Sequence, residues 1–158
     1  MKFEEPQDLN GVAKFHQLFR LPIVENPKIP GKDRIDLRLS LIEEELNELK
    51  TAISENDLVE VADAFADLQY VLSGAILEFG LGPKFKAIFD EVQRSNMSKL
   101  CKSLDEAEKT KEYYLRERGV ESYIEKVDDE YQVSRVGDGK VLKSINYSPP
   151  EIESILNS

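Results

Sequence analysis

Helical periodicity in the first half of the chain constrains the fold most strongly. Between residues 33 and 53, apolar side chains recur at steps of four and three, at Ile35, Leu39, Ile42, Leu46, Leu49 and Ile53. These steps place the side chains on one face of an α-helix, whereas a strand would need a period of two. An isolated amphipathic helix is only marginally stable in water. The stripe must therefore pack against other helices, and it predicts a helical bundle.

Capping and helix-breaking residues predict where the helices of this bundle begin and end. Asn56 can cap a third helix, and Ser103 with Glu106 has the spacing of a capping box at a fifth. Gly80 and Gly119 are positioned to end helices. The prolines and the glycine between residues 22 and 31 predict an irregular loop. We expect helices over residues 8–20, 33–53, 57–79, 83–99 and 104–118.

The residues after 118 have a different pattern. Short runs rich in β-formers predict three strands, over residues 123–127, 131–136 and 140–144. Ser148 and Glu151 flank two prolines and predict a capping box at a short terminal helix. The expected fold is therefore mainly α. A helical domain over residues 1–118 carries a small β appendage, with a short terminal helix, over residues 119–158.

Charge and residue content exclude several functional classes. The formal net charge is −10, which argues against a surface that coats nucleic acid, because such a surface must be basic. A single histidine, His16, excludes Cys/His zinc sites and Ser-His-Asp triads. We see no apolar run long enough to span a membrane and no secretion-signal pattern. With Cys101 as the single cysteine, we expect a cytoplasmic protein without a membrane or nucleic-acid partner.

Two pairs of carboxylates at helical spacing are the strongest indication of chemistry. Glu45 and Glu48 lie three residues apart on the second expected helix, and Glu60 and Asp63 do so on the third. Residues at this spacing share a helix face, so neighbouring helices can bring the four carboxylates together. Carboxylates that lie close to one another repel unless a cation lies between them. The pattern therefore favours a hard, oxygen-binding metal ion such as Mg²⁺.

The composition of the third expected helix supports this interpretation. Between residues 58 and 77 the helix is apolar or small on almost every side, and its acids, Glu60, Asp63 and Asp67, fall within about 60° of arc. We expect such a helix to be buried, where an isolated carboxylate is costly unless it is paired or binds metal. Two alternatives stay open. The acids can form a solvated face, or Arg38 can form a salt bridge with a buried acid.

The order of these residues resembles a known signature. The chain reads Arg38-x-x-Leu41-Ile42-x-Glu44-Glu45-x-x-Glu48 and then Glu60-x-x-Asp63, which is similar to the Glu-x-x-Glu … Glu-x-x-Asp signature of the all-α nucleoside triphosphate pyrophosphohydrolases. That superfamily includes MazG proteins, dimeric dUTPases and phosphoribosyl-ATP pyrophosphohydrolase. Motifs of its MazG-like, phosphoribosyl-ATP-pyrophosphohydrolase-like branch resemble Val92-x-Arg94-Ser95-Asn96-Met97-Ser98-Lys99 and Asp138-Gly139-Lys140-Val141-Leu142-Lys143.

The resemblance implies a metal site, an activity and an assembly. By position, it implies Mg²⁺ ligands, with Mn²⁺ as an alternative ion, at Glu45, Glu48, Glu60 and Asp63. Glu44 and Glu45 would have catalytic roles, with Glu44 holding a further metal ion or orienting the attacking water. We predict that water attacks the α-phosphorus of a nucleotide and that pyrophosphate leaves. The resemblance also implies a homodimer or a dimer of dimers.

Polar and basic side chains are expected to hold the nucleotide substrate. The candidates are Arg94, Asn96, Lys99, Lys140 and Lys143, with Asn96 reading the base or the sugar. We expect Arg38 and Asp67 to contact the metal ligands without binding the metal ion, or to pair with each other. For each lysine, the alternative is a solvated surface charge. The insert over residues 101–130 leaves open whether Lys140 and Lys143 reach the same place as the other residues.

Two other functions are compatible with the sequence. The chain could be a non-catalytic regulator that binds a nucleotide and a metal ion, or a helical interaction module whose acids are salt-bridged. Release of pyrophosphate from a panel of nucleotides separates the enzyme from the regulator. Stabilisation by a divalent metal ion separates both from the interaction module.

Overall fold

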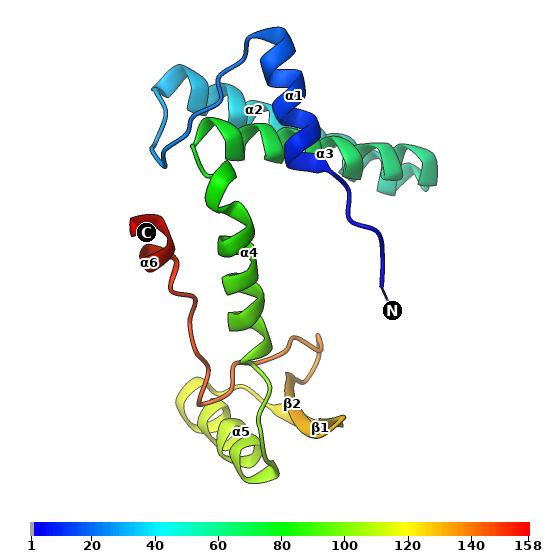
Figure 1. Cartoon of the computed structure of the whole chain (residues 1–158). Helices are drawn as coiled ribbons and strands as arrows, with labels where there is room; N and C mark the ends of the chain where they lie inside the picture. The colour runs from blue at the N-terminus through cyan, green and yellow to red at the C-terminus, as the bar shows by residue number, and fades with distance from the viewer. Residues whose placement is uncertain (1) are drawn as a thin grey trace. The chain divides into compact units, whose positions relative to one another are not determined.

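The computed structural model describes residues 2–158. In this part of the chain, six helices precede and follow one two-stranded sheet (Figure 1). The chain forms two compact units, of which the first extends to Lys86 and the second runs from Ala87 to Ser158. The division falls within helix α4, Gly82–Met97. The prediction of a mainly α fold with a small β appendage is confirmed.

The first unit consists of three packed helices and a loop. Helix α2, Lys32–Glu55, packs along α3, Leu58–Glu78, and α1, Asp8–Phe19, packs against α3. The buried apolar side chains of this unit are Val12, Leu49, Ala52, Ala64, Ala75, Ile76 and Leu77. The predicted loop between α1 and α2 is also present. Its backbone is fixed to the end of α3, because the N–H of Val24 donates to the carbonyl of Leu77 at 3.0 Å.

The junction between α2 and α3 differs from the prediction by one residue. Asn56 does not cap α3; it ends α2 in a left-handed conformation, with φ at 56°. The capping residue of α3 is Asp57, whose carboxylate accepts hydrogen bonds from the backbone N–H groups of Val59 and Glu60. Both residue types cap helices well and both tolerate turns, so the sequence alone did not separate the two positions.

The expectation that α3 is buried on every side is wrong for the single chain. Its last six residues, 73–78, are buried, but Leu58 and Val59 in its first turn are 80% and 76% exposed. Half of the predicted stripe on α2 is exposed as well. The large apolar side chains exposed on α2 and α3 are Leu37, Leu39, Leu46, Ile53, Leu58, Val59, Phe65, Tyr70 and Leu72. An apolar surface of this extent is typical of an interaction face.

The second unit has its own core between a helix and a hairpin. Helix α5, Leu104–Arg118, packs against strands β1, Ser122–Val127, and β2, Glu130–Arg135, which pair antiparallel. The buried core consists of Cys101, Ala107, Val133 and Leu142. The predicted capping box at α5 is present, since Ser103 accepts from the N–H of Glu106 and Glu106 accepts from the N–H of Lys102. The division into domains at residue 118 stays a prediction.

Two predictions for the C-terminal segment are wrong. The third strand, over residues 140–144, is reduced to one isolated bridge between Ser134 and Val141. The short terminal helix exists as α6, Ile152–Asn157, but Glu151 is its N-cap and makes no side-chain capping bond. Ser148 instead accepts a hydrogen bond from Arg94 of α4. Among the described residues, every helix is too short or too polar to cross a membrane.

Candidate functional site

The acids predicted to bind metal lie on the first unit around Glu45. Burial raises the pKa of the Glu45 carboxyl, and the nearby charges of Asp67, Glu48, Glu44 and Asp63 raise it further. Asp63 and Asp67 belong to α3, whereas the other three belong to α2. Carboxylates from both helices therefore act on Glu45, but Glu60 is not among them, and the predicted metal site stays a prediction. The negative charge of these neighbouring acids opposes ionisation of the Glu45 carboxyl.

These acids are not arranged as a finished metal site in the single chain. Glu45 and Asp67 are half-buried, whereas Glu48, Glu60 and Asp63 are exposed. Within residues 2–158, no three His, Cys, Asp or Glu side chains lie close enough together to hold a metal ion. Glu60 lies in the first turn of α3, close to the Asp57 cap. Side-chain rotation or a further subunit would be needed to gather the oxygen ligands.

Arg38 forms a salt bridge with a buried acid, which is one of the alternatives left open by the sequence, but that acid is Glu78. Its guanidinium donates to the Glu78 carboxylate at 2.5 Å and does not pair with Asp67. Arg34 also binds Glu78, with its Nε 2.9 Å from a carboxylate oxygen. His16 Nδ1 donates to the carbonyl of Pro22 at 2.8 Å, so its Nε2 accepts from Arg38 at 3.1 Å. This buried network links α1, α2 and α3 and accounts for Arg38 without a role in metal binding.

Glu78 is the centre of that network, with an exposed fraction of only 1%. Burial alone would oppose its ionisation, but the hydrogen bonds from Arg34 and Arg38 outweigh this effect. The pKa of Glu78 therefore lies below its usual value. Gly74 allows the close packing, because a Cβ at that position would lie 2.6 Å from an Arg38 nitrogen.

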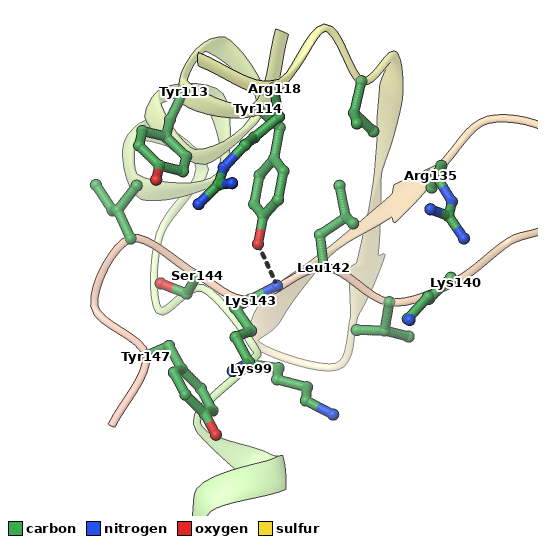
Figure 2. Close-up of a pocket in the computed structure, with 13 residues that line it drawn as sticks. Lys99, Tyr113, Tyr114, Arg118, Arg135, Lys140, Leu142, Lys143, Ser144 and Tyr147 are labelled. Carbon is green, nitrogen blue, oxygen red and sulfur yellow. Dashed lines mark hydrogen bonds between the residues drawn. The ribbon is translucent and has the colours of Figure 1, made fainter. Parts of the chain in front are cut away.

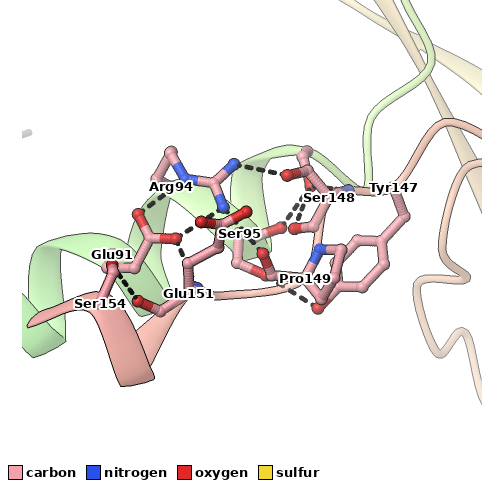
Figure 3. A network of polar contacts seen from close by, with 9 residues as sticks. Glu91, Arg94, Ser95, Tyr147, Ser148, Pro149, Glu151 and Ser154 are labelled. Carbon is pink, nitrogen blue, oxygen red and sulfur yellow. Dashed lines mark hydrogen bonds and ion pairs between the residues drawn. The ribbon is translucent and has the colours of Figure 1, made fainter. Parts of the chain in front are cut away.

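The serines of the Ser95-Asn96-Met97-Ser98-Lys99 motif hold the C-terminal segment in place (Figure 3). Ser95 is buried and its hydroxyl lies 2.8 Å from the hydroxyl of Tyr147. Ser98 accepts a hydrogen bond from the backbone N–H of Ser148 at 3.0 Å. These contacts fix the segment that carries Tyr147 beside the end of α4. Asn96 is exposed and does not line the pocket described below.

Arg94 also binds the C-terminal segment (Figure 3). Its Nε donates to Oε2 of Glu91 and its Nη2 donates to Oε1 of the same carboxylate, both at 2.8 Å. Its remaining donors reach the Ser148 hydroxyl at 3.1 Å and the Pro149 carbonyl at 3.0 Å. Together with a bond from the N–H of Glu151, this pairing lowers the pKa of Glu91 to about 2. Arg94 thus fastens the C-terminal segment to α4.

Three predicted substrate-binding lysines line one large pocket of the second unit (Figure 2). The pocket has a volume of about 1070 Å³ and includes Lys99, Lys140 and Lys143. The insert does not separate them, because α5 and the hairpin form one side of the same pocket. The pocket also contains residues that the sequence analysis did not select, namely Tyr113, Tyr114, Arg118, Arg135 and Tyr147. Their clustering depends on tertiary contacts, although the basic end of α5 was a local signal for Arg118.

The turn at Gly137-Asp138-Gly139 has a structural role. Both glycines have positive φ, at 102° and 68°. Asp138 accepts from the backbone N–H of Lys140 at 3.1 Å and forms an ion pair with Arg135. This turn presents Lys140 at the rim of the pocket and leaves Arg135 with a neutralising partner.

A known protein family matches the first part of the chain. A family model described as phosphoribosyl-ATP pyrophosphohydrolase matches residues 12–96. The match includes all the acids around Glu45 and ends before Lys99, the first residue of the basic pocket. An uncharacterized protein of Acanthamoeba polyphaga mimivirus is 26% identical to this chain, in an alignment that covers 97% of this chain and 97% of that protein.

Proposed function

The chain belongs to the phosphoribosyl-ATP pyrophosphohydrolase family, and on that premise we propose that it is a Mg²⁺-dependent nucleotide pyrophosphohydrolase. The substrate is a nucleoside triphosphate or a related nucleotide, and the products are the monophosphate and pyrophosphate. The observation that carries the proposal is the accumulation of carboxylates from two helices around Glu45. We also propose that the protein acts in the cytoplasm, where its single buried cysteine stays reduced.

The donor set around Glu45 fits a hard divalent cation. All the groups are carboxylates, the oxygen ligands that Mg²⁺ and Mn²⁺ prefer. Burial and the mutual repulsion of these acids both raise the pKa of Glu45, and bound positive charge would relieve the repulsion. Glu45, Glu48, Glu60 and Asp63 would hold the ion. When bound, it would neutralise phosphate charge and make a water molecule more acidic.

The remaining chemistry falls to the side chains. Water attacks the α-phosphorus in line, and pyrophosphate is the leaving group. Glu44 orients the attacking water and accepts its proton, and Glu45 takes part in catalysis as a ligand of the ion. Asp67 lies close enough to Glu45 to keep the local field negative before the substrate binds. The expected role of Lys99, Lys140 and Lys143 in binding phosphate groups stays a prediction; all three line a pocket of the second unit.

We propose a homodimer, or a dimer of dimers, as the active assembly. The apolar side chains exposed on α2 and α3 support this, since a second copy of the helix pair would cover them. The same contact would bury the first turn of α3, where Glu60 lies. Burial there would reduce the mobility of the carboxylates that the single chain leaves exposed.

Release of pyrophosphate from a panel of nucleotides, with and without Mg²⁺, tests the activity. The panel contains dUTP, dCTP and phosphoribosyl-ATP. We expect Glu48→Gln and Asp63→Asn to reduce turnover at least about a hundredfold, because each removes a charged ligand. The matched control is Glu43→Gln, an exposed acid on the same helix. Unchanged turnover in the first two variants would refute the site assignment, and turnover without any divalent ion would refute the metal dependence.

A further inference from the structure

The pocket of the second unit is strongly basic in an acidic protein. Of the residues that line it, Lys99, Arg118, Arg135, Lys140 and Lys143 are cationic, and no lining residue is a carboxylate. The chain as a whole has a net charge of −10. Gathering five cations around one cavity costs repulsion, which a bound anion would relieve.

Most of these cations have no acidic partner. Arg135 forms an ion pair with Asp138. In the described part of the chain, no ion pair joins Lys99, Arg118 or Lys140 to a carboxylate. Lys143 lies over the ring of Tyr147, with its Nζ 4.2 Å from the ring centroid. The pocket therefore holds uncompensated positive charge.

The position of Lys143 is fixed by the insert. The hydroxyl of Tyr114 on α5 accepts a hydrogen bond from the backbone N–H of Lys143 at 3.2 Å (Figure 2). Tyr147, on the opposite side of this lysine, is held by Ser95 at 2.8 Å. The bond with Ser95 and the charges of Lys143 and Lys99 keep the pKa of Tyr147 below its usual value, against the effect of burial. The lowered pKa of Tyr147 is therefore consistent with a positive electrostatic potential in this pocket.

Helix α5 adds an aromatic surface to the cationic one. The rings of Tyr113 and Tyr114 meet edge to face, with centroids 5.4 Å apart. Tyr113 is 42% exposed and lines the pocket together with Tyr114 and with Arg118, which lies about one helical turn after Tyr114. Exposed aromatic rings beside cations are the usual platform for a nucleobase whose phosphates are bound nearby.

We propose that this pocket binds a nucleoside phosphate without the help of a divalent metal ion. The phosphate groups contact Lys99, Arg118, Lys140 and Lys143, and the base lies against Tyr113. The volume of about 1070 Å³ is large enough for a whole nucleotide. In this proposal, the segment over residues 101–130 supplies the side of the pocket that Tyr113, Tyr114 and Arg118 line. The inference deepens the proposed function, because it rests on a nucleotide as the ligand class, but it concerns residues outside the family match.

Isothermal titration of the full-length chain with ATP and with inorganic pyrophosphate, both in EDTA, tests the proposal. We expect both ligands to bind the wild type. Arg118→Ala and Lys140→Ala should weaken ATP binding at least about tenfold, because each removes a charge-assisted hydrogen bond. Arg116→Ala is the matched control, since Arg116 is an exposed arginine on the same helix outside the pocket. It should change the affinity less than about twofold.

Tyr113→Ala separates the base from the phosphates. It should weaken ATP binding and leave pyrophosphate binding unchanged, because only ATP carries a base. The affected residues are exposed, and far-ultraviolet circular dichroism confirms that each variant is folded. The proposal is overturned if ATP does not bind in EDTA, or if Arg118→Ala and Arg116→Ala behave alike. A short oligonucleotide that binds more tightly than ATP would also overturn it.

The outcome is separable from that of the proposed function. If Mg²⁺-dependent pyrophosphate release is intact while the Arg118 and Arg116 variants bind ATP equally well in EDTA, the pocket proposal fails alone. If binding in EDTA depends on Arg118 but no nucleotide is hydrolysed, the enzyme proposal fails alone.

Discussion

Replacing Glu78 with Gln tests whether a buried ion network holds the first unit together. Glu78 and Arg38 have side-chain exposures of 1% and 8%, and Arg34 binds the same carboxylate from a position that is 34% exposed. Gln keeps the size of Glu but removes its charge, so the Arg38 cation is left buried beside His16 without a counterion. Loss of one partner of a buried pair costs about 3–5 kcal/mol.

The free energy of unfolding, measured by urea denaturation at pH 7, is the suitable assay. At roughly 2 °C per kcal/mol for a chain of this size, Tm should also fall by at least about 6 °C. Glu43→Gln, an exposed change on α2, is the control and should stay within about 0.5 kcal/mol of the wild type. Replacing Arg38 with Met and Glu78 with Leu together should recover part of the loss, because no buried cation is then left without a counterion; Arg34, which also loses its partner, is 34% exposed.

The same network predicts a pH dependence. The pKa of Glu78 is lowered in the folded state, so its contribution to stability is complete above the usual value for an unfolded chain, about 4.3. That contribution is lost as the pH falls through the lowered, folded-state pKa. The wild type should therefore lose stability in acid more steeply than Glu78→Gln. If Glu78→Gln unfolds like the wild type at pH 7, the reasoning from buried charge is refuted.

Three further changes test local features of the fold. Gly80→Ala should destabilise by several kcal/mol, because a Cβ would lie 2.0 Å from the Asn26 carbonyl oxygen, whereas Gly119→Ala, with a similar φ and open space, should cost only about 1 kcal/mol by thermal unfolding. Asp57→Ala should cost about 0.5–2 kcal/mol in the same assay through loss of the α3 cap. Ser98→Ala should speed hydrogen exchange of the C-terminal segment, and unchanged exchange would contradict its anchoring role.

Features that depend on neighbours in the sequence were predictable. The helices, the stop at Gly119 and the capping box at Ser103 follow from short-range hydrogen bonding, and the structure confirms them. Where two neighbouring residues suit the same role, as Asn56 and Asp57 do, the prediction was wrong by one position. The expected third strand is missing for a related reason, since pairing depends on a partner strand that the local sequence does not specify.

At the candidate sites, too, local features were predictable from the sequence and long-range contacts were not. The spacing of Glu45, Glu48, Glu60 and Asp63 predicted which helix face each carboxylate occupies, because that face is set by helical geometry alone. Their meeting at one metal ion stays a prediction. The sequence left open a salt bridge between Arg38 and a buried acid, but it did not identify Glu78, 40 residues further along the chain, as that acid.

The sequence by itself determined the helices, their faces and the acidic character of α2 and α3. Only the tertiary structure decided which charges meet. Lys99 and Arg118 share a pocket because α5 folds back over the hairpin and the C-terminal segment is fastened to α4. Helical periodicity is set by local backbone hydrogen bonds, whereas the partner of a charge is set by the packing of distant segments.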